Sequence, residues 1–152
     1  MIFPDDGDAV PFWYSISTDS LAAKRSIWMV PENLALFDYL LIGEHLDQIR
    51  SLFDLRESVF LYRTSQLLHL LDLADDSDRF ARYCSHEMRK KTCLVIALLP
   101  NPKVLILDAI FEGLDPIMTK TAKKSLQASS HERDNKFLTT NVLTAATDLV
   151  KQ

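Results

Sequence analysis

Glycine is scarce in this sequence. Among 152 residues only three are glycine, Gly7, Gly43 and Gly113. A phosphate-binding loop of the form G-x-x-x-x-G-K-[S/T], a dinucleotide-binding G-x-G-x-x-G and a nucleophile elbow G-x-S-x-G all need closely spaced glycines. The three glycines lie far apart, so this sequence contains none of these motifs.

Cysteine is also rare. The two cysteines, Cys84 and Cys93, are predicted to lie on one helix and show no Cys/His spacing of a zinc site. We therefore expect no disulfide, as is usual for a cytosolic protein.

Long apolar runs and excess positive charge are missing as well. No stretch approaches the ~18 apolar residues that cross a bilayer, and the first residues lack the pattern of a secretory signal. A net charge of −4 gives no support for binding to nucleic acid. We expect no direct membrane insertion and a cytoplasmic location, with any place at the inner face of a membrane reached through a partner. The 47% of hydrophobic residues are typical of one globular domain.

The clearest local pattern is a buried strand that leads into a turn. Residues 104–107 are apolar without alternation, as in a parallel strand covered on both faces, and Asp108 stands where that strand ends. Ligand sites of open α/β sheets lie at such strand ends. Gly113 allows a turn, and Asp115 with Pro116 can begin a helix.

Strands and helices are predicted to alternate along the chain. An amphipathic helix over 44–54 has Leu46, Ile49, Leu52 and Phe53 on its apolar face. In the next helix His69 lies among leucines and is predicted to be a partly buried core residue rather than a ligand. The acidic segment 72–78 lacks the pattern of a calcium loop and is predicted to be solvated. Further strands are predicted at 10–16 (at an edge, because of Pro11), 26–30 and 136–140, and further helices at 21–24, 59–73, 87–99 and 116–128.

Four segments resemble motifs of the ATP-binding cassette (ABC) transporter ATPases. Residues 105–116, Leu-Ile-Leu-Asp-Ala-Ile-Phe-Glu-Gly-Leu-Asp-Pro, resemble the Walker B strand and D-loop, L-L-L-D-E-P-T-x-G-L-D-P. The resemblance implies that Asp108 is a latent magnesium ligand and that Asp115 belongs to a nucleotide-binding site. Ala109 stands where the family has the glutamate that orients the attacking water, and a methyl group cannot accept a proton.

Two flanking segments extend the resemblance. Residues 27–40 are similar to the Q-loop region, with Glu32 at the position that reaches the magnesium shell; the alternative is that Glu32 is a turn acid without a ligand. Residues 137–143 are similar to the switch segment, with Asn141 in place of its histidine. An amide can hydrogen-bond a γ-phosphate but carries no charge and moves no proton.

The fourth segment, residues 84–88, aligns with the ABC signature, L-S-G-G-Q or, in export-type members, Y-S-x-G-M. The resemblance implies that Ser85 offers its hydroxyl to the γ-phosphate held by an opposing subunit. The alternative is that Ser85 only caps the following helix, which contributes about 1 kcal/mol. Glu87 replaces a signature glycine, and two like charges ~4 Å apart at a dielectric near 20 repel by about 4 kcal/mol. We therefore expect a folded helix that binds ATP poorly.

The resemblance predicts an α/β fold, a partial P-loop NTPase domain similar to ABC ATPases, with parallel strands and a helical subdomain. We expect one truncated domain over 1–152, with the helical subdomain at 35–85 and the Walker B and D-loop core at 86–152. Because the Walker A loop is missing from the sequence, we expect residues 10–16 or self-association of the chain to cover one edge of the strand at 104–107.

The resemblance implies ATP and magnesium as cofactors, although none is expected to bind the chain in isolation. It implies an intact ABC ATPase subunit or a transmembrane permease as partner. Three interpretations remain: a non-hydrolysing (pseudo-ATPase) module of a transporter system, an active ATPase half whose phosphate loop is on another chain, and a truncated gene remnant. The substitutions at Glu87, Ala109 and Asn141 disfavour the active enzyme, because phosphoryl transfer depends on positioning and charge stabilisation.

Overall fold

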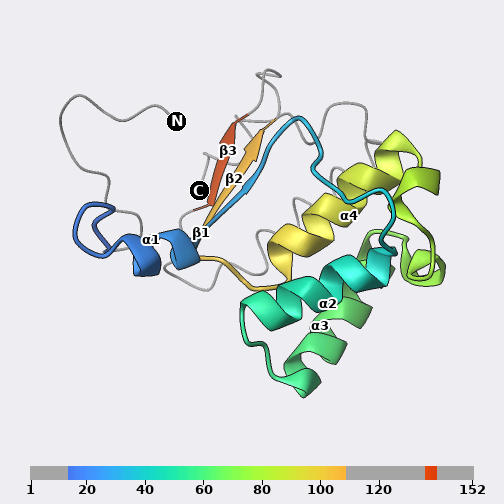
Figure 1. Ribbon diagram of the computed structural model, residues 1–152, viewed down its shortest axis with the longest axis horizontal. Helices are drawn as coiled ribbons and strands as arrows, with labels where there is room; N and C mark the ends of the chain where they lie inside the picture. The colour runs from blue at the N-terminus through green and yellow to red at the C-terminus, as the bar shows by residue number, and fades with distance from the viewer. Residues whose placement is uncertain (1–13, 109–135, 140–152) are drawn as a thin grey trace.

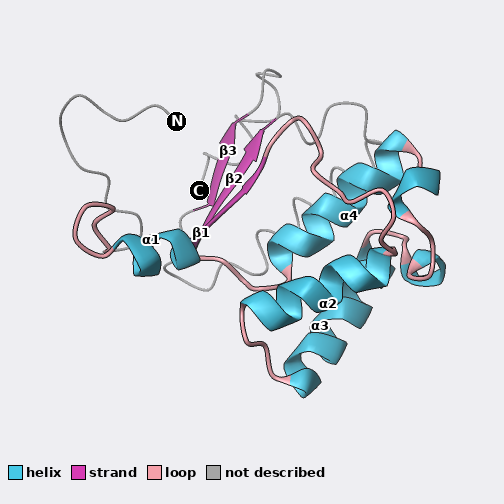
Figure 2. Ribbon diagram, viewed as in Figure 1, coloured by secondary structure: helices cyan, strands magenta, loops and turns pink. Residues whose placement is uncertain are grey.

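The fold is that of a computed structural model, which describes residues 14–108 and 136–139 of the chain. These residues form a three-stranded parallel sheet and a group of helices. The sheet has the order β1-β2-β3, and Figure 1 shows helix α4 between the sheet and the pair α2 and α3. Figure 2 shows the strands side by side. In chain order the elements are α1 (Ser20–Ser26), β1 (Ile27–Val30), α2 (Ile42–Leu52), α3 (Glu57–Leu70), the 3-10 helices η2 (Ala74–Asp76) and η3 (Ala81–Tyr83), α4 (His86–Leu98), β2 (Val104–Asp108) and β3 (Lys136–Thr139).

Strand β2 has a parallel neighbour on each side. Its residue Leu105 is opposite Trp28 of β1, and it is also opposite Lys136 of β3. The expectation that residues 10–16 or another copy of the chain would cover one edge of this strand is therefore wrong, because β1 and β3 occupy both edges of β2. The expected strand at 10–16 is wrong for Tyr14–Ile16, which form no strand, while residues 10–13 lie outside the described part.

Helix α4 is at the centre of the hydrophobic core. It contacts α2, α3 and β1 and is buried around most of its circumference, which explains why its sequence is apolar on several faces. Leu94, Val95 and Leu99 are fully buried, as are Leu105 and Leu107 of β2. The Arg63 side chain of α3 donates to the Leu99 carbonyl at 3.0 Å and so satisfies a carbonyl at the C-terminal end of α4.

The chain uses aspartate and asparagine where other proteins use glycine at helix ends. Asp54 after α2, Asp72 after α3 and Asn101 after α4 have φ values of 52°, 55° and 54°. Asp and Asn tolerate this left-handed conformation better than other residues with a side chain. The helix predicted at 59–73 therefore ends earlier than expected, at Leu70, because the backbone of Asp72 adopts the left-handed conformation.

Several side-chain predictions need correction. Leu52 was expected on the apolar face of α2 but is 70% exposed, whereas Leu46 and Ile49 are buried as predicted. His69 is exposed and not part of the core. Cys84 follows η3 and lies outside α4, which contains Cys93, so the two cysteines are not on one helix; both are free thiols, as expected.

The predicted helix at 116–128 lies outside the described residues. None of the described helices is long and apolar enough to cross a membrane.

Candidate functional site

The carboxyl ends of the three parallel strands meet at one edge of the sheet. Val30 ends β1 opposite Leu107 of β2, and Asp108 ends β2 opposite Thr139 of β3. Glu32 follows two residues after Val30, in an exposed bend. The fold thus brings the backbones of the Glu32 segment and Asp108 to the edge where open α/β sheets bind ligands.

The structure describes three of the five residues that the sequence proposed for the site. Glu32 is exposed, and Asp108 is placed by its backbone at the end of β2. Ser85 immediately precedes α4. Asp115 and Asn141 lie outside the described residues, as does Ala109.

Ser85 is the N-cap of α4. Its Oγ atom accepts a hydrogen bond from the Met88 backbone N–H at 3.1 Å, which satisfies one of the free donors of the first helical turn. Ser85 therefore caps α4, as the capping interpretation expects. The hydroxyl is exposed and retains its own proton for donation to another group.

Glu87 and Lys91 form an ion pair on the first turns of α4. Glu87 Oε1 lies 2.9 Å from Lys91 Nζ, and the Lys91 side chain is only 9% exposed. The carboxylate of Glu87 is thus fixed close to the helix N-terminus, where it satisfies the helix dipole. An anion that approached the Ser85 hydroxyl would meet this carboxylate nearby.

Magnesium is the metal that the sequence resemblance implies. Carboxylate oxygens suit this cation, and Glu32 and Asp108 are the acids of the described sheet edge. Nowhere in the described ranges do three or more His, Cys, Asp or Glu residues form a group that could hold a metal ion.

One arginine lies against three aromatic rings close to Ser85, which the sequence patterns did not reveal. The Arg82 Cζ atom is 4.9 Å, 5.3 Å and 4.6 Å from the ring centroids of Tyr39, Phe80 and Tyr83. We call these four residues the aromatic platform. The run Phe80-Ala-Arg-Tyr83 was the available sequence signal, but the participation of Tyr39 depends on the fold.

Ionic and backbone contacts tie the segment after β1 to the start of α4. Arg89 Nη1 donates both to Asp38 Oδ1 and to the Ala81 carbonyl, each at 2.9 Å. Beside them, burial raises the pKa of the Cys84 thiol; Arg79 and Arg89 oppose this effect and Asp76 adds to it. A raised pKa leaves less of the Cys84 thiol in the reactive thiolate form.

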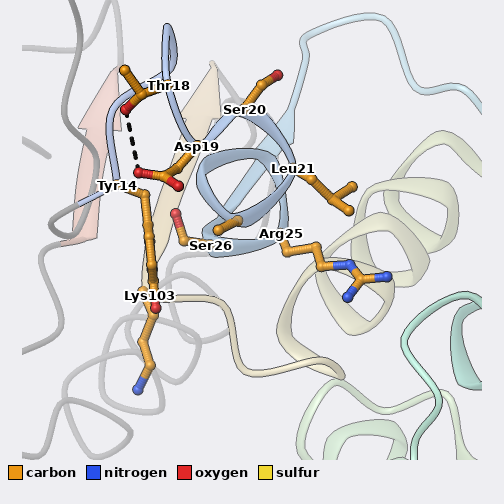
Figure 3. Close-up of a pocket in the computed structure, with 9 residues that line it drawn as sticks. Tyr14, Thr18, Asp19, Ser20, Leu21, Arg25, Ser26 and Lys103 are labelled. Carbon is orange, nitrogen blue, oxygen red and sulfur yellow. Dashed lines mark hydrogen bonds between the residues drawn. The ribbon is translucent and has the colours of Figure 1, made fainter.

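A cavity of about 630 Å³ lies at the opposite end of the described chain, beside α1. Thr18 and Asp19 in its wall share a hydrogen bond of 3.3 Å. Figure 3 shows the Arg25 and Lys103 side chains extending in different directions, so they do not converge on one ligand group. Neither Glu32 nor Ser85 lines this cavity.

Comparisons with known proteins identify relatives of this chain. The chain is 33% identical over 130 residues to the phospholipid-transporting ATPase ABCA3 of Homo sapiens, a match that covers 86% of this chain and 8% of that protein. It is 32% identical over 117 residues to the uncharacterized ABC transporter ATP-binding protein YthP of Bacillus subtilis (strain 168), covering 77% of this chain and 50% of that protein. No protein-family model matches the chain.

A solved structure agrees with these relatives. The structure of an ATP-binding subunit of an ABC transporter superposes with a TM-score of 0.83 and 25% sequence identity, covering 90% of this chain and 57% of that one. The chain thus spans about half the length of the ATP-binding proteins that it matches, and a small part of the longer transporter.

Proposed function

Because this chain is homologous to the ATP-binding domains of ABC transporters, we propose that it is a module of a transporter system that does not hydrolyse ATP. The module binds an intact ABC ATPase subunit or a transmembrane permease and is held by that partner at the inner face of a membrane. Within the module, residues 35–85 form the helical subdomain and residues 86–152 the core. Glu32, Ser85, Asp115, Asn141 and Asp108 are vestiges of the nucleotide and magnesium sites.

The arrangement of Glu87 carries this proposal. In the family signature the equivalent position is a glycine, whose backbone can come close to a phosphate. Here the residue has a carboxylate, held 2.9 Å from Lys91 in the first turn of α4. Its negative charge disfavours binding of the γ-phosphate, and its side chain occupies space that glycine leaves open.

Two substitutions in the sequence support the same conclusion. Ala109 cannot orient the attacking water as the family glutamate does, and Asn141 cannot carry the charge of the switch histidine. Phosphoryl transfer is catalysed almost entirely by positioning and charge stabilisation, so losing these groups together removes its basis.

Titration calorimetry with Mg-ATP tests the nucleotide part of the proposal. We expect no saturating heat at millimolar nucleotide and no phosphate release above a buffer control. Ala109→Glu alone is expected to leave this result unchanged, because Glu87 and Asn141 remain. A saturating heat together with turnover would favour the alternative of an active ATPase half.

Co-purification from the native source tests the partner. Recovery of an ABC ATPase with a complete phosphate loop, or of a permease, supports the module. A chain recovered alone as a monomer contradicts it and favours a gene remnant. Size-exclusion chromatography with light scattering of the purified chain separates these outcomes from self-association.

A further inference from the structure

The aromatic platform is exposed although three of its four side chains are large rings. Tyr39 is 75% exposed, Tyr83 63% and Phe80 37%. Tyr, Phe and Arg are also the side chains enriched in the energetically important centres of protein interfaces. Aromatic groups gathered at one exposed place indicate a binding surface, whereas single exposed apolar residues do not.

Backbone hydrogen bonds hold the platform in place before any partner binds. Leu41 and Phe80 form an antiparallel bridge. The Ala81 N–H donates to the Leu40 carbonyl at 2.9 Å, and the Arg82 N–H donates to the Asp38 carbonyl at 3.1 Å. Tyr39 is thereby fixed beside the η3 segment, and a surface fixed in this way loses little conformational entropy on binding.

The charge of Arg82 determines which partner fits. Arg79 is paired with Asp76 at 2.7 Å and Arg89 with Asp38 at 2.9 Å. Within residues 14–108 and 136–139, Arg82 is stacked on rings and its guanidinium makes no side-chain hydrogen bond or ion pair. A guanidinium has five donors that suit a carboxylate, and stacking on rings leaves its edge accessible.

We propose that the aromatic platform binds an acidic segment of a partner polypeptide. A carboxylate of the partner pairs with the edge of Arg82, and an adjacent apolar side chain packs on Tyr39 and Tyr83. The inference deepens the proposed function by giving the chemistry of the module's partner, and it rests on that function only in taking the partner to be a polypeptide. An anionic membrane surface fits less well, because such surfaces attract clusters of several Lys and Arg residues. Here Arg79 and Arg89 are already paired with Asp76 and Asp38.

A selection from random peptides tests this proposal directly, because it finds the sequences that the platform prefers. Phage displaying random twelve-residue peptides are selected on the immobilised full chain, and the best peptide is measured by fluorescence anisotropy. We expect Asp or Glu beside aromatic or aliphatic residues in the selected sequences. Arg82→Gln is expected to weaken binding about tenfold or more, as for a central interface residue.

Two further variants test whether the peptide binds at the aromatic platform and not elsewhere on the chain. Arg56→Gln removes an exposed arginine at the start of α3, outside the platform, and should leave the affinity unchanged. Tyr83→Ser keeps Arg82 but removes one ring, and should weaken binding as well. Circular dichroism confirms that each variant is folded.

The proposal is overturned if no peptide is enriched, if the selected peptides are basic, or if Arg56→Gln weakens binding as much as Arg82→Gln. It is also overturned if phosphatidylserine vesicles bind in an Arg82-dependent way while the peptides do not. Measured ATP turnover would contradict the proposed function but not the peptide result, so the two failures can be told apart.

Discussion

The imidazole of His45 holds the backbone of Phe37 in place. Nε2 of His45 accepts a hydrogen bond from the Phe37 N–H at 3.0 Å, while Nδ1 lies 2.7 Å from the Leu41 carbonyl. A carbonyl can only accept, so Nδ1 carries the proton and the ring is the neutral tautomer. Because His45 is 4% exposed, this contact fixes the segment between β1 and α2 from inside the protein.

Replacing His45 tests this role. In His45→Phe the Phe37 N–H loses its acceptor and the Leu41 carbonyl loses a donor, so we expect the free energy of unfolding to fall by about 1–3 kcal/mol. Urea denaturation of the variant and the wild type measures the difference. His69→Phe is the matched control, since His69 is exposed, and it should change stability by less than about 0.5 kcal/mol. Equal effects of the two substitutions would contradict the assigned role.

The contrast between the two histidines shows what the sequence could and could not predict. Apolar runs and turn residues located β1, β2 and β3 and the helices α1 to α4 within a few residues, because local periodicity reflects burial against one common core. They placed His69 in the core and overlooked His45. The hydrogen bonds of His45 reach a loop whose path is set by tertiary folding, and no local pattern records that path.

The candidate site also contains one feature that the sequence predicted and one that it did not. Ser85 as an N-cap is encoded locally, by a serine before a helical segment with an acid in its first turn, and the structure confirms it. The aromatic platform joins Tyr39 to Arg82 across the bridge between two segments. Such a contact depends on how the segment before α2 pairs with η3, so the sequence did not reveal it.

Leu46 and Leu52 lie on the same helix but should respond differently to truncation. Leu46 is fully buried, and Leu46→Ala is expected to cost about 2–5 kcal/mol through lost burial and a cavity. Leu52 is 70% exposed, and Leu52→Ala should change stability by less than about 0.5 kcal/mol. Urea denaturation of both variants checks the pair. A large loss for Leu52→Ala would mean that a partner or another copy covers this end of α2.

Stability should decrease at alkaline pH because of Cys93. Burial raises the pKa of this thiol from 9.0 to about 11. Below pH 9 the thiol is protonated in both states, and as the pH rises from 9 towards 11 only the unfolded chain releases the proton. By pH 10 this linkage should lower the free energy of unfolding by about 1 kcal/mol relative to pH 8.

Cys93→Ala isolates this effect from the other groups that titrate at high pH. The stability difference between the wild type and this variant, measured by urea denaturation, should favour the wild type less at pH 10 than at pH 8. The variant loses some packing at both pH values, and that loss cancels in the comparison. A difference that is the same at pH 8 and pH 10 would show that Cys93 does not contribute.

Substitutions of the two members of the ion pair between Glu87 and Lys91 should have unequal effects on stability. Lys91 is nearly buried while Glu87 is about half exposed. Glu87→Gln leaves an ammonium group in the interior without its counter-charge and should cost about 1–2 kcal/mol, a value reduced for the exposure of Glu87. Lys91→Met removes the buried charge and leaves a solvated glutamate, so it should be close to neutral.

Urea denaturation of the two single variants and the double variant measures this asymmetry. The double variant should recover most of the stability that Glu87→Gln loses, because no unpaired cation remains. If Glu87→Gln alone were neutral, the ion pair would not be needed for folding. The outcome also decides how to test whether Glu87 prevents phosphate binding at the N-terminus of α4. If Glu87 stabilises Lys91, then Glu87→Gly must be made together with Lys91→Met. Only that pair of changes opens the N-terminus of α4 without leaving a buried charge behind.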